Sequence, residues 1–202
     1  DQLETIAGLN DPSASQSAIE LMTRTFPVWL GHQAKLTSEG SQIRVSAGEH
    51  SVVVDKVLAA MGRRSNVDWL SIENAGVDLN EAGLPVFDPN TMQCGESRVF
   101  IAGDIAALNP VLHEAADEGR IAGYNAARQN STAFKRKTPF AITFTSPNIC
   151  TIGAAFSSLD PGTIEIGEMR LGPVGRALIM GMNRGIIRIY VDKSTGILKG
   201  AT

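Results

Sequence analysis

The sequence predicts a mixed fold of the α/β and α+β classes, with helices and strands first and an antiparallel sheet in the last third. Two observations carry this prediction. Apolar residues recur at helical spacing in two segments, whereas the chain beyond residue 138 alternates between short apolar runs and turn residues. Of the 202 residues, 43% are hydrophobic and 19% are charged, which is typical of a globular protein with one or two domains.

A helix is predicted to begin at Pro12. Asp11 can cap the first amides, and proline fits the first helical position because its missing N–H has no intrahelical partner there. Apolar residues then follow helical spacing up to Phe26. From there the period changes to two over residues 28–36, and turns separate this run from two further apolar runs. We therefore expect three antiparallel strands within residues 28–58.

The middle of the chain predicts a short strand followed by a long helix. Asp68 is expected to cap a short helix that contains Trp69. The apolar run 98–102 reads as a strand, and residues 112–129 read as a helix. Small residues are expected to form the face on which this helix lies close to a sheet: Ala115, Ala116, Gly119, Ala122, Gly123 and Ala126.

Residues 131–137 are basic and polar, and we interpret them as a solvated linker. Strand-like runs follow at residues 139–144, 149–152, 164–169, 185–191 and 197–199.

Charge, cysteine count and hydropathy limit the partners. A formal net charge of −3 argues against a nucleic-acid-binding face. Cys94 and Cys150 are too few for a disulphide framework and are spaced neither as a metal pair nor as a short redox pair, so we interpret them as small buried residues in a reducing compartment, the cytoplasm. No signal peptide is visible after Asp1, and prolines interrupt the uncharged stretch 138–159. We expect no membrane partner.

The residues best suited to bind a ligand are Gly103 and Asp104, between the predicted strand and helix. Ligands of open α/β sheets lie beyond the carboxyl ends of strands, where a glycine admits close approach and an aspartate can accept hydrogen bonds from sugar-like hydroxyls. The following helix start offers unpaired amides and a partial positive charge. A structural turn explains the same pair equally well.

Two longer motifs surround this pair. One runs over residues 57–66 and is followed by Asn-Ala-Gly-Val at 74–77; the other is Val-Phe-Ile-Ala-Gly-Asp at 99–104, followed by His-Glu-Ala-Ala-Asp-Glu-Gly at 113–119. In this order they resemble the pyridine nucleotide–disulphide oxidoreductases, especially the dihydrolipoamide dehydrogenases, and residues 139–153 resemble the start of that family's dimerisation domain. The resemblance implies partial FAD- and NAD(P)-binding Rossmann-like domains followed by a partial antiparallel-sheet dimerisation domain.

The resemblance also implies domain limits and assembly. Residues 1–60 would be the C-terminal half of an NAD-binding domain, residues 61–134 the C-terminal segment of an FAD-binding domain, and residues 135–202 the first part of a truncated dimerisation domain. The intact protein would then be a homodimer.

The resemblance also implies which residues would bind FAD and which would bind NAD. Gly103 and Asp104 would hold the ribityl chain of FAD, and the amides of Val111 and Leu112, beside His113, would face its pyrimidine edge. The positions lining the NAD site would be Met61, Gly62 and Ala34. Two departures from the family pattern are Ser65, where a proline is usual, and Asn148, where a glutamate is usual.

The family's catalytic and phosphate-binding motifs have no counterpart in this sequence. It contains neither Gly-x-Gly-x-x-Gly loop, neither member of the redox cysteine pair, and no His-Pro segment carrying the base. The sequence therefore predicts an internal fragment of a longer enzyme that passes electrons between NAD(H), flavin and a disulphide or dithiol substrate. The fragment itself is expected to be inactive, so no catalytic residue is assigned.

Alternatives remain open for the parent and for the piece. The parent could be a related flavoprotein such as a soluble transhydrogenase or a mercuric reductase, and the piece could be a non-catalytic, self-associating binding module. A metal site is not expected, because the run His113-Glu114-x-x-Asp117 has aspartate where a zinc-binding helix has its second histidine. His32 and His50 are expected to be structural or exposed.

Overall fold

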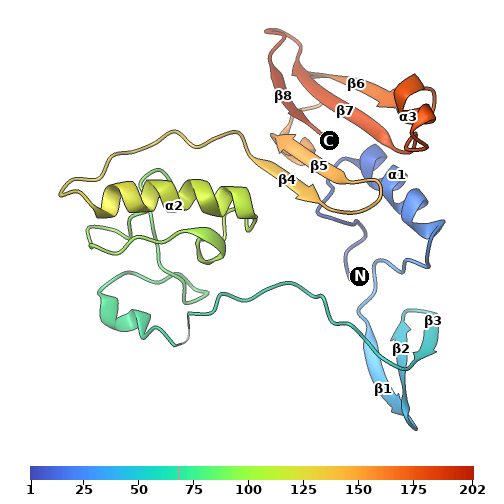
Figure 1. Ribbon diagram of the computed structural model, residues 1–202, viewed down its shortest axis with the longest axis horizontal. Coiled ribbons are helices and arrows are strands. Elements are labelled where there is room, and N and C mark those ends of the chain that lie inside the picture. Colours follow the sequence, from blue (N-terminus) through green and yellow to red (C-terminus); the bar gives the residue numbers. More distant parts are fainter. Residues whose placement is uncertain (68) are drawn as a thin grey trace. The chain divides into compact units, whose positions relative to one another are not determined.

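The computed structural model describes residues 1–67 and 69–202, and this chain divides into two compact units (Figure 1). The first unit combines residues 1–60 with residues 139–202, and the second comprises residues 61–138. The predicted cap at Asp68 lies outside the described residues. Assigning the three sequence segments to NAD-binding, FAD-binding and dimerisation domains stays a prediction.

Helix α1 (Pro12–Thr23) begins where the sequence predicts. Oδ1 of Asp11 accepts hydrogen bonds from the amide nitrogens of Ser13 at 2.9 Å and Ala14 at 3.1 Å. These bonds satisfy two amides that have no partner inside the helix. The predicted capping aspartate and first-turn proline are therefore confirmed.

The first unit next forms an antiparallel three-stranded sheet, as predicted. Its strands are β1 (Lys35–Glu39), β2 (Gln42–Ala47) and β3 (His50–Val54), in the order β1-β2-β3. Tight turns join neighbouring strands, and Val45 of β2 lies opposite Leu36 on one side and Val52 on the other. This row of cross-strand pairs fixes the register.

The expectation that residues 28–34 belong to the first strand is wrong. This segment pairs with the chain's first residues instead of with β2: the amides of Gly31 and His32 donate to the carbonyl oxygens of Leu3 and Asp1. Gly31 has a φ of +72°, which breaks an extended conformation. The alternating apolar residues of segment 28–34 therefore lie in a loop, and its backbone hydrogen-bond partners are the first residues of the chain.

The second sheet of this unit has five strands, all antiparallel, and it confirms the antiparallel part of the predicted fold class. The strands are β4 (Phe140–Thr143), β5 (Ile149–Gly153), β6 (Ile164–Arg170), β7 (Ile186–Asp192) and β8 (Leu198–Ala201), in the order β4-β5-β8-β7-β6. Each matches a predicted strand to within two residues. The 3-10 turn η3 (Phe156–Ser158) and the short helix α3 (Gly175–Ile179) lie between strands.

Gly153 of β5 lies opposite Gly200 of β8. Its φ is +75°, and a Cβ at this position would clash with the carbonyl oxygen of Lys199. Gly153→Ala is therefore expected to lower the free energy of unfolding by about 3 kcal/mol, because it combines a left-handed conformation with a backbone clash. Urea unfolding measures the change. Gly172→Ala is the control, since no atom lies within 4 Å of its Cβ position; an equal loss in both variants would contradict this explanation.

The second unit contains η1 (Ile72–Ala75), η2 (Gly103–Ala106) and the helix α2 (Leu112–Ala126). The predicted start of the helix at residue 112 is confirmed. One face of α2 contributes to the hydrophobic core of this unit, which consists of Met92, Cys94, Ile101, Ala106, Ile121 and Ala122. Burial raises the pKa of the Cys94 thiol, so the thiolate is disfavoured. The prediction of a small buried residue is confirmed for Cys94, whereas Cys150 is only partly buried.

The predicted strand at residues 98–102 is wrong. Phe100 forms only an isolated bridge with Gln93, and the neighbouring backbone bonds join Val99 to Cys94 and Ile101 to Met92. The segment is extended but short, because the chain turns at Gly103 with a φ of +82°.

Two expectations about α2 and the segment after it are also wrong. The buried residues of α2 are Glu114, Glu118, Ile121, Ala122 and Asn125, whereas most of the predicted small-residue face is exposed. Residues 131–137 are not simply a solvated linker, because Arg136 and Lys137 form ion pairs with the acidic residues of α2. Acidic side chains lie on the buried face because these cations partner them.

In the described part of the chain, no helix combines the length and apolar character that crossing a bilayer requires.

Candidate functional site

The Gly103–Asp104 turn lies against α2 in the second unit. Asp104 is in η2, and its side chain is 47% exposed. Its Oδ2 lies 2.6 Å from Nη1 of Arg63, whose Nη2 donates to the carbonyl oxygen of Pro110 at 2.7 Å. Arg63 therefore connects the aspartate to the loop that leads into α2. The carboxylate points to solvent and to a cation, not into the core.

Within the described part of the chain, the N-cap residue of α2 supplies no side-chain hydrogen bond to the first turn. This residue is Val111, in an extended conformation, and Leu112 in the first turn is 87% exposed. An uncapped helix start presents partial positive charge to a ligand with a negative edge. Of the two amides expected to face such a ligand, that of Val111 donates to the carbonyl oxygen of Asn109 at 2.7 Å.

The residues predicted for a nucleotide lie in both units. Met61 is 91% exposed, and Gly62 has a φ of +102° with no atom of the other described residues, its chain neighbours aside, within 4 Å of its Cβ position. The backbone at Gly62 is therefore open to a close neighbour. Ala34 lies in the other unit, exposed, directly before β1. The structure thus groups Gly103, Asp104 and the start of α2.

The buried residues that bind the backbone of the Gly103 turn were not predicted from the sequence. Glu118 of α2 is buried and accepts a hydrogen bond from the amide nitrogen of Gly103, and it also pairs with Arg136. The available signal was the pair of glutamates one helical turn apart, Glu114 and Glu118, followed by a basic segment. Because residues 131–137 were interpreted as a solvated linker, the burial of Glu114 and Glu118 was not predicted.

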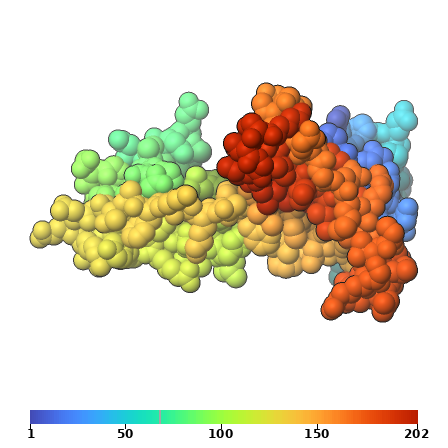
Figure 2. Space-filling view, turned by 90° about the horizontal axis from the view of Figure 1, so that it is seen from above, coloured from blue at the N-terminus to red at the C-terminus, as the bar shows by residue number. Residues whose placement is uncertain are grey.

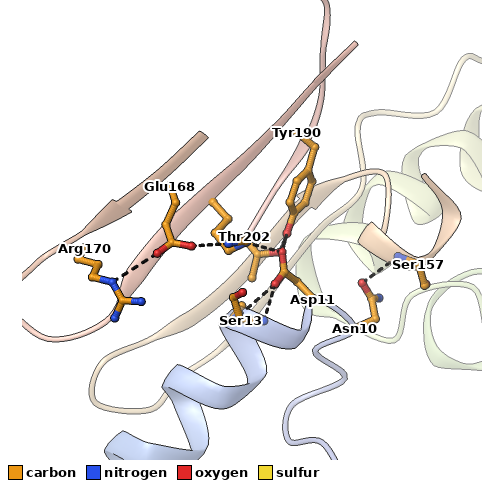
Figure 3. A network of polar contacts seen from close by, with 10 residues as sticks. Asn10, Asp11, Ser13, Ser157, Glu168, Arg170, Tyr190 and Thr202 are labelled. Carbon is orange, nitrogen blue, oxygen red and sulfur yellow. Dashed lines mark hydrogen bonds and ion pairs between the residues drawn. The ribbon is translucent and has the colours of Figure 1, made fainter. Parts of the chain in front are cut away.

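A second polar network lies in the other unit, around Asp11 (Figure 3). Besides capping α1, its Oδ2 accepts hydrogen bonds from Nε of Arg188 and from the hydroxyl of Tyr190, both at 2.7 Å. Arg188 also pairs with Glu168, and the Tyr190 hydroxyl lies 3.0 Å from Oγ1 of Thr202. Asp11 and Tyr190 are buried. The network joins the first helix to β7.

The pKa values of this network move as its contacts require. Burial alone would raise the pKa of Asp11, but hydrogen bonds from Tyr190 and Ala14, with Arg188, hold it below the ordinary value of 3.8. Burial, together with the neighbouring carboxylate, raises the pKa of Tyr190 to about 12.

Among the described residues, no group of three or more histidine, cysteine, aspartate or glutamate side chains could hold a metal ion. Glu114 and Asp117, from the run that superficially resembles a zinc-binding helix, pair with Arg136 and Lys137. His50 stacks on Trp29, with 5.1 Å between the ring centroids.

Comparison with solved structures supports the Rossmann-like part of the fold. The copper(II) complex of the HOCl-induced flavoprotein disulphide reductase RclA from Escherichia coli matches with a TM-score of 0.85 at 21% identity, over 100% of this chain and 46% of that one. LpdA from Mycobacterium tuberculosis matches with a TM-score of 0.82 at 24% identity, over 99% of this chain and 44% of that one. At these identities the likeness establishes the fold, and the predicted fold class is confirmed.

Sequence comparison gives the family. Dihydrolipoyl dehydrogenase 3 of Haloarcula marismortui is 31% identical over 84% of this chain and 35% of its own length. Dihydrolipoyl dehydrogenase of Thermus scotoductus is 29% identical over 89% and 39%, and mercuric reductase of Staphylococcus aureus is 28% identical over 95% and 35%. The chain thus spans less than two fifths of these relatives. A family model described as pyridine nucleotide-disulphide oxidoreductase matches residues 10–131, and the chain belongs to this family.

Proposed function

We propose that this chain supplies the ribityl and flavin-edge side of the FAD site in an oxidoreductase of the dihydrolipoamide dehydrogenase type. The parent protein would pass electrons between NAD(H), flavin and a disulphide or dithiol substrate. Members of the family use FAD and NAD(P)H, which supports both cofactors for this chain. The exposed carboxylate of Asp104 beside the uncapped start of α2 is the observation that carries the proposal.

Each residue of this site has a stated task. The carboxylate of Asp104 accepts hydrogen bonds from ribityl hydroxyls, in place of its ion pair with Arg63 or together with it. The turn at Gly103 keeps the backbone close to α2, so that the carboxylate and the helix start serve one ligand. The start of α2 favours negative charge at the pyrimidine edge. Bound FAD would supply the hydride and electron chemistry.

The nucleotide side of the proposal rests on positions with open backbone. Met61 and Gly62 are exposed, and Gly62 leaves room for a ligand to approach its main chain. These two residues would line the NAD site, and the assignment of Ala34 to the same site stays a prediction, because it belongs to the other unit. We assign no catalytic residue, because the sequence contains neither the redox cysteine pair nor the base of the family.

The proposal is tested by adding FAD to a 202-residue preparation whose intact mass has been verified. We expect FAD binding, seen as a shifted visible flavin spectrum and retained flavin in equilibrium dialysis. We expect no reduction of lipoamide by NADH, because the nucleophile is missing. Absence of any bound flavin would contradict the proposed site, and lipoamide turnover would contradict the expectation of an inactive piece.

Exposed apolar side chains favour a second role, self-association, for the five-stranded sheet. Ile152 of β5 and the residues Ile187 and Ile189 of β7 are each at least 40% exposed, and Figure 2 shows the surface formed by the C-terminal strands in orange and red. Patches of this kind commonly mark interfaces. A homodimer of the parent, located in the cytoplasm, belongs to the same proposal. Sedimentation with and without FAD separates a dimer that binds flavin from one that only associates.

A further inference from the structure

Glu118 is an acidic side chain that the fold has buried almost completely. It is 1% exposed, and its Oε2 accepts a hydrogen bond from the amide nitrogen of Gly103 at 2.7 Å. A buried carboxylate is costly unless hydrogen bonds and an opposite charge compensate it. The bond to Gly103 crosses from α2 to η2, fifteen residues earlier in the chain.

Arg136 supplies the opposite charge for this carboxylate. Its Nη2 lies 3.2 Å from Oε1 of Glu118 and 2.8 Å from Oε2 of Glu114. Its Nε has no hydrogen-bond partner among the described residues and lies 3.9 Å from Oδ2 of Asp117. One guanidinium thus serves two buried glutamates of α2, and only one of these glutamates reaches across to the Gly103 turn.

The Gly103 turn rests directly on α2. A Cβ at Gly103 would lie 3.5 Å from the Cβ of Ala115, which is ordinary contact, and the φ of +82° sends the chain outwards at this point. Asp104 is the next residue, so a displacement of the Gly103 amide displaces the carboxylate. The bond from this amide to Glu118 therefore sets where Asp104 stands relative to the start of α2.

We propose that Glu118, held in place by Arg136, is the positioning residue of the flavin site. It does not touch the ligand and acts through the backbone of Gly103 on Asp104. This inference rests on the proposed function, since the ligand that Asp104 meets is the ribityl chain of FAD. An ion pair that only stabilised the unit would give Glu114 and Glu118 equivalent roles.

Three substitutions separate the effects of the length of the Glu118 side chain, its charge and the stability of the unit. Glu118→Asp keeps the charge opposite Arg136 but is one methylene shorter, so its carboxylate no longer reaches the Gly103 amide. Glu118→Gln keeps an acceptor at the right distance and removes the charge. Glu114→Asp is the matched control, because it shortens the other glutamate that pairs with Arg136 and leaves the bond to Gly103 intact.

FAD binding to the 202-residue chain is measured by equilibrium dialysis, with the visible circular dichroism of the bound flavin as a signature of its surroundings. We expect Glu118→Asp to raise the dissociation constant about tenfold, the equivalent of 1.4 kcal/mol, and to alter the dichroism. Glu118→Gln should restore binding to within about threefold of wild type, as neutral acceptors are weaker. Glu114→Asp should leave both readouts unchanged even where it lowers the unfolding midpoint.

If wild type binds FAD, two results would overturn the inference and leave the proposed function standing. In the first, Glu118→Asp binds FAD as tightly as wild type. In the second, Glu114→Asp weakens FAD binding as much as Glu118→Asp does. A third, in which Glu118→Gln fails and Glu118→Asp does not, would assign the effect to charge and overturn it as well. A wild-type chain that takes up no FAD would instead overturn the proposed function, and the inference with it. Hydrogen exchange at the Gly103 amide, faster in Glu118→Asp than in wild type, checks the tether without any ligand.

Discussion

Asp11→Ala is expected to lower the free energy of unfolding of the first unit by about 3–5 kcal/mol, the usual cost of removing one member of a buried ion pair. The substitution leaves Arg188 without its buried partner and deprives the Tyr190 hydroxyl of its acceptor. It also removes the cap of α1. Urea unfolding followed by circular dichroism measures the change.

A control for Asp11→Ala is Asp55→Ala, because Asp55 is an exposed aspartate with a hydrogen bond from Gln42. It should change the free energy of unfolding by no more than about 0.5 kcal/mol. Similar losses in the two variants would show that the buried network contributes little.

The same network predicts how stability depends on pH. The pKa of Asp11 is lower in the folded chain than in the unfolded chain, so its stabilisation is complete above the unfolded value and is lost as pH falls through the folded value. The pKa of Tyr190 is raised from 10 to about 12 in the folded chain. Its contribution to the free energy of unfolding is therefore complete below pH 10 and is lost as pH rises to about 12. Tyr190→Phe should therefore reduce the loss of stability on the alkaline side.

Asp104→Ala is expected to weaken FAD binding by roughly 10- to 100-fold, because hydrogen bonds to a charged acceptor contribute about 1.5–3 kcal/mol each. The carboxylate is half exposed and outside the core, so the unfolding midpoint should hardly move. Equilibrium dialysis with FAD and urea unfolding of the same sample measure the two effects together.

Glu81→Ala is the matched control for Asp104→Ala, since it removes another exposed carboxylate of the second unit at a distance in sequence from the turn. It should leave FAD binding unchanged. If both variants bind FAD as wild type does, the assignment of Asp104 to the ribityl chain is wrong.

Local signals in the sequence were sufficient for much of the fold. Asp11 and Pro12 marked the start of α1 because capping depends on neighbours in the chain. Alternating residues between turns marked the strands of both sheets, because hairpin register depends on residues close in sequence. The turn at Gly103 and Asp104 was singled out from the motif around it, and its role as a ligand site stays a prediction.

Contacts between distant segments left no such signal. Nothing near Glu118 indicates that its partner is the Gly103 amide, and nothing near Arg136 distinguishes a buried guanidinium from a solvated one. The pairing of Asp11 with Arg188 spans 177 residues. Alternation over 28–34 misled for the same reason, since its backbone partners lie at the start of the chain.

The division of the first unit into two segments has a consequence for synthesis. Residues 61–138 are continuous in sequence, whereas the carboxylate of Asp11 can meet Tyr190 only after β7 has been translated. Until then a charged group and the apolar surface around it remain in water. A nascent chain that ends before residue 186 therefore holds Asp11 without its partners Arg188 and Tyr190.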